Sequence, residues 1–394
     1  MPTESAFVLA ALFVLMAGIG WAFRHFADHD REPPPPPRVS AEYMRGLNLV
    51  LNRRTDEALE LFVQMAKVDD ETLETHFALG HLFRRRGEVD RAIRVHQNLL
   101  ARPNLSESQR HQALFSLGED YLSAGLFDRA EKLFNELTES DSHAEAALRK
   151  LVYIFEQERD WKQAIEARRK LEVLGGQKLP EVAHYYCELA EQARRDGDLA
   201  LAKDYLKHTV RSETGALRGS IIRAAIAEEE GDYAQAQALY TNIIESDRRI
   251  ISEVLARAFA CYKAMGRESE FDRYVDSLIS QDASLVRDFA FGAIVSDIRD
   301  SHALSAAVER FVMENDVLGF LINRHELEGL AGKERSEAIG RIAQGLRQLV
   351  LSSARFRCTN CGYSSQKLIW HCPSCKHWES VRPIQHFQLE SLVT

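Results

Sequence analysis

Hydrophobic and polar residues alternate with a helical period over most of this chain. Between residues 40 and 280, apolar residues recur every three to four positions, and no strand-like alternation of any length interrupts them. The helical pattern continues less regularly over residues 284–298, 302–314 and 316–330. Residues 334–354 then carry a well-defined apolar stripe on one face. The pattern therefore predicts an all-α fold for the greater part of the chain.

Within this region a pattern of small and large residues recurs about every 34 residues. An alanine slot is occupied by Ala58, Ala92, Ala130, Ala164, Ala202 and Ala236, with Phe271 in the same place. A turn slot five residues upstream holds Arg53, Gly87, Gly125, Arg159, Gly197, Gly231 and Gly266. A repeat of this length, built as helix, turn and helix, resembles the tetratricopeptide repeat. We expect seven copies stacked as a superhelical solenoid.

The spacing has a physical cause in the way two helices cross. Small residues at Gly46, Gly80 and Gly118 let the first helix of a pair approach the second, and large residues then fill the gaps between pairs. Such arrays line an inner groove with the first helix of each pair. Projecting the repeat onto that helix gives seven candidates for a partner-binding groove: His81, Arg84, Glu119, Arg149, Tyr153, Glu191 and Arg194.

The beginning of the chain differs from the rest in its hydropathy. Residues 6–23 carry no charge and would extend about 27 Å as a helix at 1.5 Å per residue. No basic residue precedes them, whereas Arg24, Arg31 and Arg38 follow. The positive-inside rule then predicts an uncleaved single-pass anchor with the bulk of the chain in the cytoplasm. Five prolines, Pro33 to Pro37, form a stiff spacer after it.

The strongest chemical signal lies near the other end. Cys358-x2-Cys361 and Cys372-x2-Cys375 are two knuckles separated by ten residues, a spacing typical of a tetrahedral site for one metal ion. Iron and zinc both accept four thiolates, so the sequence leaves the metal open. About 40 residues are too few for a stable apolar core without the ion, although Trp370 and Trp378 could supply a small aromatic one. Because the preceding helix runs straight into this module, we expect the module to dock on the array.

Composition and charge narrow the function classes. The chain is 45% hydrophobic and 28% charged, which is ordinary for a folded protein. A net charge of -9 argues against binding to nucleic acid, which requires a basic face. A phosphate-binding loop, a dinucleotide fingerprint and a His-Glu-x2-His motif are all missing from the sequence. These observations favour a non-enzymatic protein.

Cys358-x2-Cys-Gly-Tyr363 and Cys372-Pro-Ser-Cys375 resemble the two knuckles of rubredoxin. Together with an N-terminal anchor and a tetratricopeptide array, they make the whole chain similar to the lipopolysaccharide assembly protein B family of Gram-negative bacteria. That resemblance implies an adaptor at the cell inner membrane that controls lipopolysaccharide biosynthesis. Its implied partners are the membrane protease FtsH, the lipid A deacetylase LpxC, whose proteolysis it promotes, and lipopolysaccharide or its assembly machinery. Family metal ligands carry over onto Cys358, Cys361, Cys372 and Cys375.

The expected organisation has six parts. These are a periplasmic N-terminus (1–4), a transmembrane anchor (5–23), a proline-rich linker (24–39), the repeat array (40–280), degenerate repeats or capping helices (281–354) and the rubredoxin-like metal module (355–394).

The leading hypothesis is a scaffold whose groove holds a client. An alternative from another class is a rubredoxin-like electron-transfer protein built on a repeat array. A zinc ribbon that binds nucleic acid is the third hypothesis.

Overall fold

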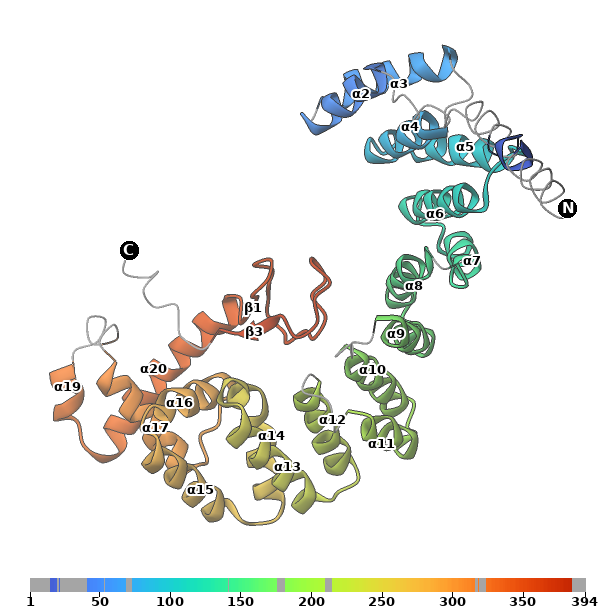
Figure 1. The fold of residues 1–394 in the computed structure, drawn as a ribbon. Coiled ribbons are helices and arrows are strands. Elements are labelled where there is room, and N and C mark those ends of the chain that lie inside the picture. Colours follow the sequence, from blue (N-terminus) through green and yellow to red (C-terminus); the bar gives the residue numbers. More distant parts are fainter. Residues whose placement is uncertain are drawn as a thin grey trace, which may run out of the picture. The chain divides into compact units, whose positions relative to one another are not determined.

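The chain folds into two compact units, Met1–Ala144 and Glu145–Thr394, in a computed structural model (Figure 1). The structure describes residues 15–19, 21, 41–52, 54–68, 73–140, 142–175, 181–209, 215–315, 318 and 324–384. Each unit has its own buried core and is considered by itself below.

From residue 41 onward, the described residues of the first unit form three helix pairs. They are α2 (Ala41–Leu51) with α3 (Thr55–Val68), α4 (Leu73–Arg85) with α5 (Val89–Leu100), and α6 (Glu107–Ser123) with α7 (Phe127–Leu137). The second helix of one pair also packs on the first helix of the next, as α3 does on α4 and α5 on α6. A capping box at Ser106 and Gln109 fixes the start of α6.

The second unit continues the same alternation of helices. Its helices are α8 (Ala144–Glu158), α9 (Trp161–Gly175), α10 (Val182–Arg195), α11 (Leu199–Lys207), α12 (Ala216–Glu229), α13 (Tyr233–Ser246), η1 (Arg248–Ile250), α14 (Ile251–Ala264), α15 (Glu268–Gln281), α16 (Leu285–Ser296), α17 (His302–Glu314), α19 (Arg324–Gly329) and α20 (Gly332–Ser352). The pair α16 and α17 follows the array, and α20 packs on both of its helices.

A small antiparallel sheet completes the second unit. Its strands are β1 (Phe356–Cys358), β2 (Ser364–Ser365) and β3 (Val381–Pro383), in the order β2-β1-β3. Phe356 pairs with Ser365 on one side and with Pro383 on the other. The sheet begins four residues after α20 ends, so the long helix leads directly into it.

The predicted repeat is confirmed by the burial of its slots. All six alanines of the alanine slot, and Phe271, are fully buried. At Gly118 a Cβ atom would lie 2.8 Å from the ring of Phe134, so only glycine allows the two helices to approach this closely. The turn slot takes the left-handed conformation, with φ of 72° at Gly125 and 59° at Arg159. The result is a mostly helical, solenoid-like array with a metal knuckle at its C-terminal end.

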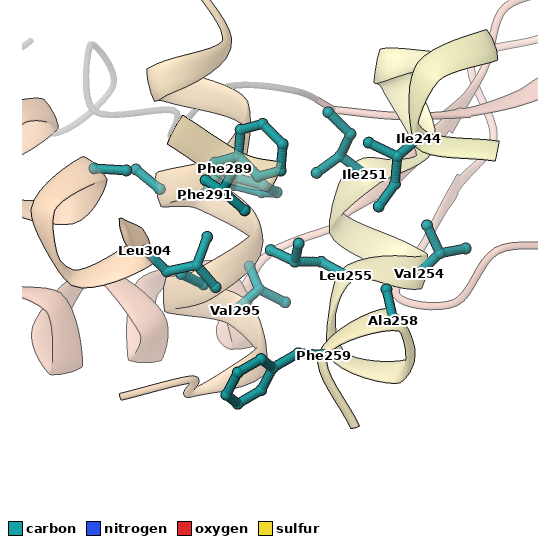
Figure 2. Close-up of a cluster of buried hydrophobic side chains, with 14 of the residues drawn as sticks. Ile244, Ile251, Val254, Leu255, Ala258, Phe259, Phe289, Phe291, Val295 and Leu304 are labelled. Carbon is teal, nitrogen blue, oxygen red and sulfur yellow. The ribbon is translucent and has the colours of Figure 1, made fainter. Parts of the chain in front are cut away.

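The core of the second unit is continuous from α12 to α20. Figure 2 shows its centre, where Leu255 of α14 faces Phe289 and Val295 of α16. At Gly292 a Cβ atom would lie 2.8 Å from Leu255, so these two helices also cross closely. Ile339, Leu346 and Val350 of the stripe on α20 belong to the same cluster, which confirms that this stripe faces inward.

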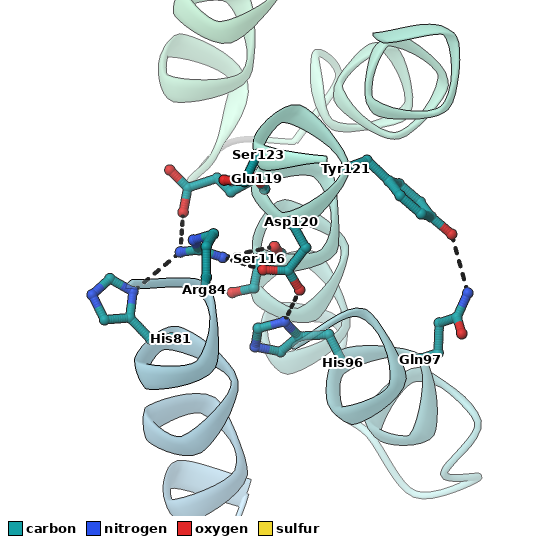
Figure 3. Close-up of polar contacts among 9 residues, drawn as sticks. All are labelled: His81, Arg84, His96, Gln97, Ser116, Glu119, Asp120, Tyr121 and Ser123. Atoms are coloured by element: carbon teal, nitrogen blue, oxygen red, sulfur yellow. Dashed lines mark hydrogen bonds and ion pairs between the residues drawn. The ribbon is translucent and has the colours of Figure 1, made fainter. Parts of the chain in front are cut away.

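A buried polar network replaces part of this apolar packing in the first unit (Figure 3). His96 occupies the slot that Phe62 and Phe134 fill in the neighbouring repeats, and its Nδ1 lies 2.5 Å from Asp120 Oδ2. Arg84 donates to the other Asp120 oxygen over 2.6 Å and to Glu119 over 2.8 Å. The side chain of Asp120 has no exposed surface, so its partners have to lie within the protein. They are Arg84 of α4 and His96 of α5.

The expected membrane anchor requires a correction. Among the described residues, no helix has the length and apolar character needed to cross a bilayer. A span needs about 20 consecutive apolar helical residues, and in this region the structure describes helix at residues 15–19 and 21. The rest of the predicted anchor at 5–23, and the linker at 24–39, lie outside the described residues. The predicted localisation as a single-pass inner-membrane protein depended on this span, and the finding contradicts it.

The buried network gives a first prediction. Replacing Asp120 with Ala should lower the free energy of local unfolding of α4 to α6 by about 3 kcal/mol, because Arg84 and His96 would lose their shared partner in the interior. Amide hydrogen exchange of the full chain measures this quantity. Glu119→Ala is the control: Glu119 is 26% exposed, and its loss should cost about 1 kcal/mol or less. Equal effects of the two changes would contradict the role assigned to Asp120.

Candidate metal centre

Four cysteine sulfurs converge at the tip of the small sheet. Cys358 ends β1, Cys361 follows in the turn after it, and Cys372 and Cys375 belong to the second knuckle. The Sγ atoms of Cys358 and Cys375 are 3.6 Å apart, those of Cys361 and Cys372 are 3.7 Å apart, and all four lie within 4.8 Å of one another. Four sulfurs about 2.3 Å from a tetrahedral ion would be separated by roughly 3.8 Å. The site therefore fits one metal ion, either iron or zinc.

The two knuckles have the same backbone design. The residue after the second cysteine is left-handed in both, with φ of 78° at Gly362 and 60° at Lys376. In each case its N–H donates to the carbonyl of the first cysteine, over 3.0 Å to Cys358 and 2.9 Å to Cys372. This tight turn directs further N–H groups at the sulfurs, so the chain's own dipoles favour thiolates. Glycine adopts this conformation readily at Gly362, whereas Lys376 adopts it as a residue with a side chain.

The groups around the sulfurs give the cysteine thiols different pKa values. The Asn360 amide and the backbone N–H of His377 lower the pKa of Cys375 to about 5. The Ser380 hydroxyl, 3.3 Å from Cys358 Sγ, lowers the pKa of that thiol. Burial raises the pKa of Cys372 to about 11. Because the thiolate is the form that binds metal, the groups around Cys375 and Cys358 favour the metal-binding form of these two residues.

The module's own core is smaller than expected and uses other residues. Phe356 and Val381, together with the buried sulfurs, form its apolar centre, and Leu368 packs beside them. Trp370 and Trp378 do not contribute to that centre. Both face the helical array instead, where the indole N–H of Trp378 finds an acceptor; a buried indole requires one.

Trp378 is the main contact between the metal module and the array. Its ring is stacked between His371 of the module, at 4.3 Å, and His184 of α10, at 4.9 Å. Its Nε1 donates to Glu156 of α8 over 3.3 Å, and the hydroxyl of Tyr185 donates to the same carboxylate over 2.5 Å. The indole is thus held on both faces and at its polar edge. The prediction that the module docks on the array is confirmed.

The imidazole of His184 is neutral in this stack. Burial lowers its pKa to about 3, and the nearby Arg218 guanidinium acts in the same direction. The 3.5 Å approach of His184 Nε2 to Glu379 is therefore not an ion pair near neutral pH. Glu379 instead accepts the backbone N–H of Gly215, just before α12, over 2.8 Å.

A second attachment point lies at the start of the sheet. Arg355, directly before β1, forms an ion pair with Glu253 of α14, and both side chains are about four-fifths buried. Burial raises the pKa of Glu253, and Arg355 opposes that shift. The metal module is thus joined to α8, α10, α12 and α14 by aromatic, hydrogen-bonding and charged contacts, so it forms one body with these helices.

Three of the seven groove candidates come together in the first unit. His81 Nδ1 lies 3.1 Å from Arg84, which in turn binds Glu119. Arg84 is only 12% exposed, so its main role in this structure is to hold α4 against α6. Beside them, Tyr43, Phe77 and other residues of α2, α4 and α6 line a cavity of about 280 Å³, which His81 also borders.

The other four candidates lie in the second unit and do not form one cluster. Glu191 and Arg194 pair over 2.8 Å on α10, and Arg194 also binds Glu229 of α12. Arg149 pairs with Glu145 on the exposed surface of α8, and Tyr153, also on α8, is 43% exposed. Contact of any of the seven with a partner stays a prediction.

Sequence reasoning missed Glu156 and His184, which receive Trp378. One signal was present in the repeat: four residues after the alanine slot, Arg168 stands where neighbouring repeats have apolar residues such as Phe134 and Leu206. Arg168 Nε donates to the hydroxyl of Tyr185 over 3.1 Å, so it belongs to the same polar cluster. Arg168, like His96, thus replaces apolar packing in this slot with a specific polar contact.

Loss of one ligand tests the metal site. Cys372→Ser should abolish retention of metal and raise amide exchange throughout residues 356–383, because the small core cannot hold without the ion. Elemental analysis after gel filtration and hydrogen exchange would measure the two effects. Cys187→Ala removes a buried thiol of α10 that lies outside the site, and should leave both unchanged. Full metal retention by Cys372→Ser would show that this thiolate is not a ligand.

Docking can be tested separately from metal binding. Trp378→Ala should leave one ion bound but raise amide exchange at the facing ends of α8 and α10 by roughly ten-fold or more, the factor that corresponds to 1.4 kcal/mol of local stability. Tyr363→Ala is the control, because Tyr363 is a 37% exposed aromatic residue of the other knuckle. Unchanged exchange at α8 and α10 in Trp378→Ala would contradict the docking role.

Models of known protein families match the metal module and part of the repeat array. The family model described as rubredoxin metal binding domain matches residues 356–383, and two tetratricopeptide repeat models match residues 75–108 and 115–178. Among solved structures, Pseudomonas aeruginosa pilF aligns with 52% of this chain and 90% of its own, at 18% identity and a TM-score of 0.32.

Curated relatives extend over nearly the whole chain. Lipopolysaccharide assembly protein B of Escherichia coli strain K12 is 33% identical over 385 residues, covering 96% of this chain and 99% of the relative. The protein of the same name from Haemophilus influenzae is 28% identical, covering 96% of this chain and 98% of its own length. The chain therefore belongs to the lipopolysaccharide assembly protein B family.

Proposed function

We propose that this chain is a non-enzymatic adaptor that regulates lipopolysaccharide biosynthesis. In this proposal it presents the deacetylase LpxC to the protease FtsH for degradation, and so couples the synthesis of lipopolysaccharide to its assembly. The repeat array holds the client, and the docked metal module forms part of the same binding surface. No step of the proposal requires the chain to break or form a covalent bond.

The observation that carries the proposal is the full-length relation to proteins named lipopolysaccharide assembly protein B. The structure adds support of a different kind. An adaptor has to hold two proteins in a fixed relation, and the metal module is held against α8 and α10 through Trp378 rather than by a single covalent connection. Binding surfaces placed on rigid elements are more precise than those on loops.

Electron transfer by an iron centre is the second candidate. One observation favours it: Cys361, a ligand of the site, is exposed, which brings a bound ion close to the protein surface. Iron would supply a one-electron couple at this site. A chain that serves only this purpose has no need for a long array of helix pairs, which is why we rank the adaptor first.

The adaptor proposal predicts the stability of its client. In cells that lack this chain but contain FtsH, the half-life of LpxC should be several-fold longer than in cells that have it. The half-life is measured by immunoblotting after protein synthesis is stopped. Tyr153→Ala, which removes a 43% exposed aromatic ring from α8, should lengthen the half-life by roughly three-fold or more, because aromatic residues contribute strongly to interfaces.

Tyr233→Ala is the matched control for this experiment. Tyr233 is 38% exposed but opens α13, the second helix of its pair, so its loss should leave the half-life of LpxC at the wild-type value. An unchanged half-life in cells without the chain would refute the adaptor role. Equal effects of the two tyrosine changes would refute the predicted groove while leaving the role itself standing.

A further inference from the structure

An open groove lies at the C-terminal end of the second unit, away from the metal centre. It runs between α17 and α20, with the end of α16 as its base, and encloses about 810 Å³. The buried side chains of Ile294, Val308 and Ile339 form its floor. Charged residues of α17, α20 and the turn after α16 form its rim.

Gly340, in the middle of α20, opens this groove further. Glycine is among the weakest helix formers, so it needs a reason at the centre of a 21-residue helix. At Gly46, Gly80, Gly118, Gly219 and Gly292, a Cβ atom would meet a side chain of this chain within 2.9 Å, which supplies the reason. At Gly340, as at Gly345 on the same helix, a Cβ atom would meet nothing within 4 Å, but of the two only Gly340 lines the groove. No described part of the chain makes use of the close approach that this glycine permits.

Most charges on the rim are compensated within the unit. Asp297 pairs with Arg299 over 2.8 Å and lies 3.7 Å from Arg347. Glu309 pairs with Arg335 over 2.7 Å.

Two rim charges remain on α20, one on each side of Gly340. Arg341 forms no ion pair with any described residue, and Glu337 has only Lys333, at 3.8 Å, whose side chain is 90% exposed. The groove thus presents one acid and one base, one helical turn apart, that form no ion pair with each other in this structure.

We propose that the occupant of this groove is a second copy of the same chain, with the two α20 helices crossing antiparallel near Gly340. A two-fold axis at this point exchanges the two charges. Glu337 then meets Arg341 of the partner subunit, and Arg341 meets Glu337 of the partner subunit. The same ion pair therefore occurs twice, as an isologous interface requires. The bare backbone at Gly340 lets the helices approach closely, and the apolar floor supplies the buried area.

A second copy explains the charge arrangement better than an unrelated partner does. Any acidic or basic helix would satisfy only one of the two rim charges and would repel the other. An antiparallel copy of α20 satisfies both without further assumptions, because its own acid and base have the same spacing. The interface does not involve the metal centre or the predicted client groove, so it is independent of the adaptor role.

Charge reversal tests the proposal. Sedimentation velocity of the full chain over a concentration series should show a reversible dimer. Glu337→Arg and Arg341→Glu should each weaken self-association by roughly ten-fold or more, because each places like charges opposite one another twice. Mixing the two variants should restore association as a heterodimer, since one chain then carries two bases and the other two acids. A double variant with both changes should form its own dimer again.

Gly340 provides a second, sterically based test. Gly340→Leu has open space in the single chain and should leave its thermal unfolding unimpaired, but should reduce dimer formation at least as much as the charge reversals. Gly345→Leu is the matched control, because Gly345 lies on the same helix with equal space around its Cβ position but does not line the groove. A wild-type chain that stays monomeric at all concentrations would overturn the proposal. A dimer insensitive to both charge reversals and to Gly340→Leu would also overturn it.

Discussion

The three repeats of the first unit each depend on two helices that cross so closely that one of them has no room for a side chain. Gly46 faces the ring of Phe62, Gly80 that of His96, and Gly118 that of Phe134, and in each case an added methyl group would lie within 2.8 Å of ring atoms. On the second helix, the small side chain in the alanine slot likewise allows the two helices to approach closely. Once these crossings are fixed, the larger residues have defined gaps to fill, and stacking the pairs produces the core.

The features that sequence reasoning predicted are those encoded by local spacing. The alanine slot, the left-handed turn at Gly125 and the four cysteines depend on residues a few positions apart, so their periods can be read from the chain. The partners of Trp378 could not be found in this way, because Glu156 is 222 residues away. The pairing of His96 with Asp120 joins two repeats and replaces a contact that the pattern predicts to be apolar. The apolar run at the N-terminus predicted a span that the described helices do not contain.

In some repeats a polar residue stands where the other repeats have an apolar one. At these positions specific hydrogen bonds and ion pairs replace apolar packing. His96 is held by Asp120 and Arg84, and Arg168 by Tyr185 near the metal module. Buried polar groups cost stability unless every partner is present, so each of them ties its position to a particular neighbour. A regular array could be extended or shifted by one repeat with little penalty. These irregular positions distinguish one repeat from the next.

The long separation between Glu156 and Trp378 also determines when the structure can be completed. A ribosome that adds about 5–20 residues per second makes Glu156 roughly 10–45 s before Trp378, because 222 residues lie between them. Throughout that interval α8 and α10 can already pair with their neighbours, while the place for the indole between Glu156 and His184 stays empty. The last part of the chain to be made therefore closes a site in its middle. If the knuckle folds only with its ion, as the Cys372→Ser prediction expects, a chain made without metal would keep an acidic and aromatic surface exposed on its central helices.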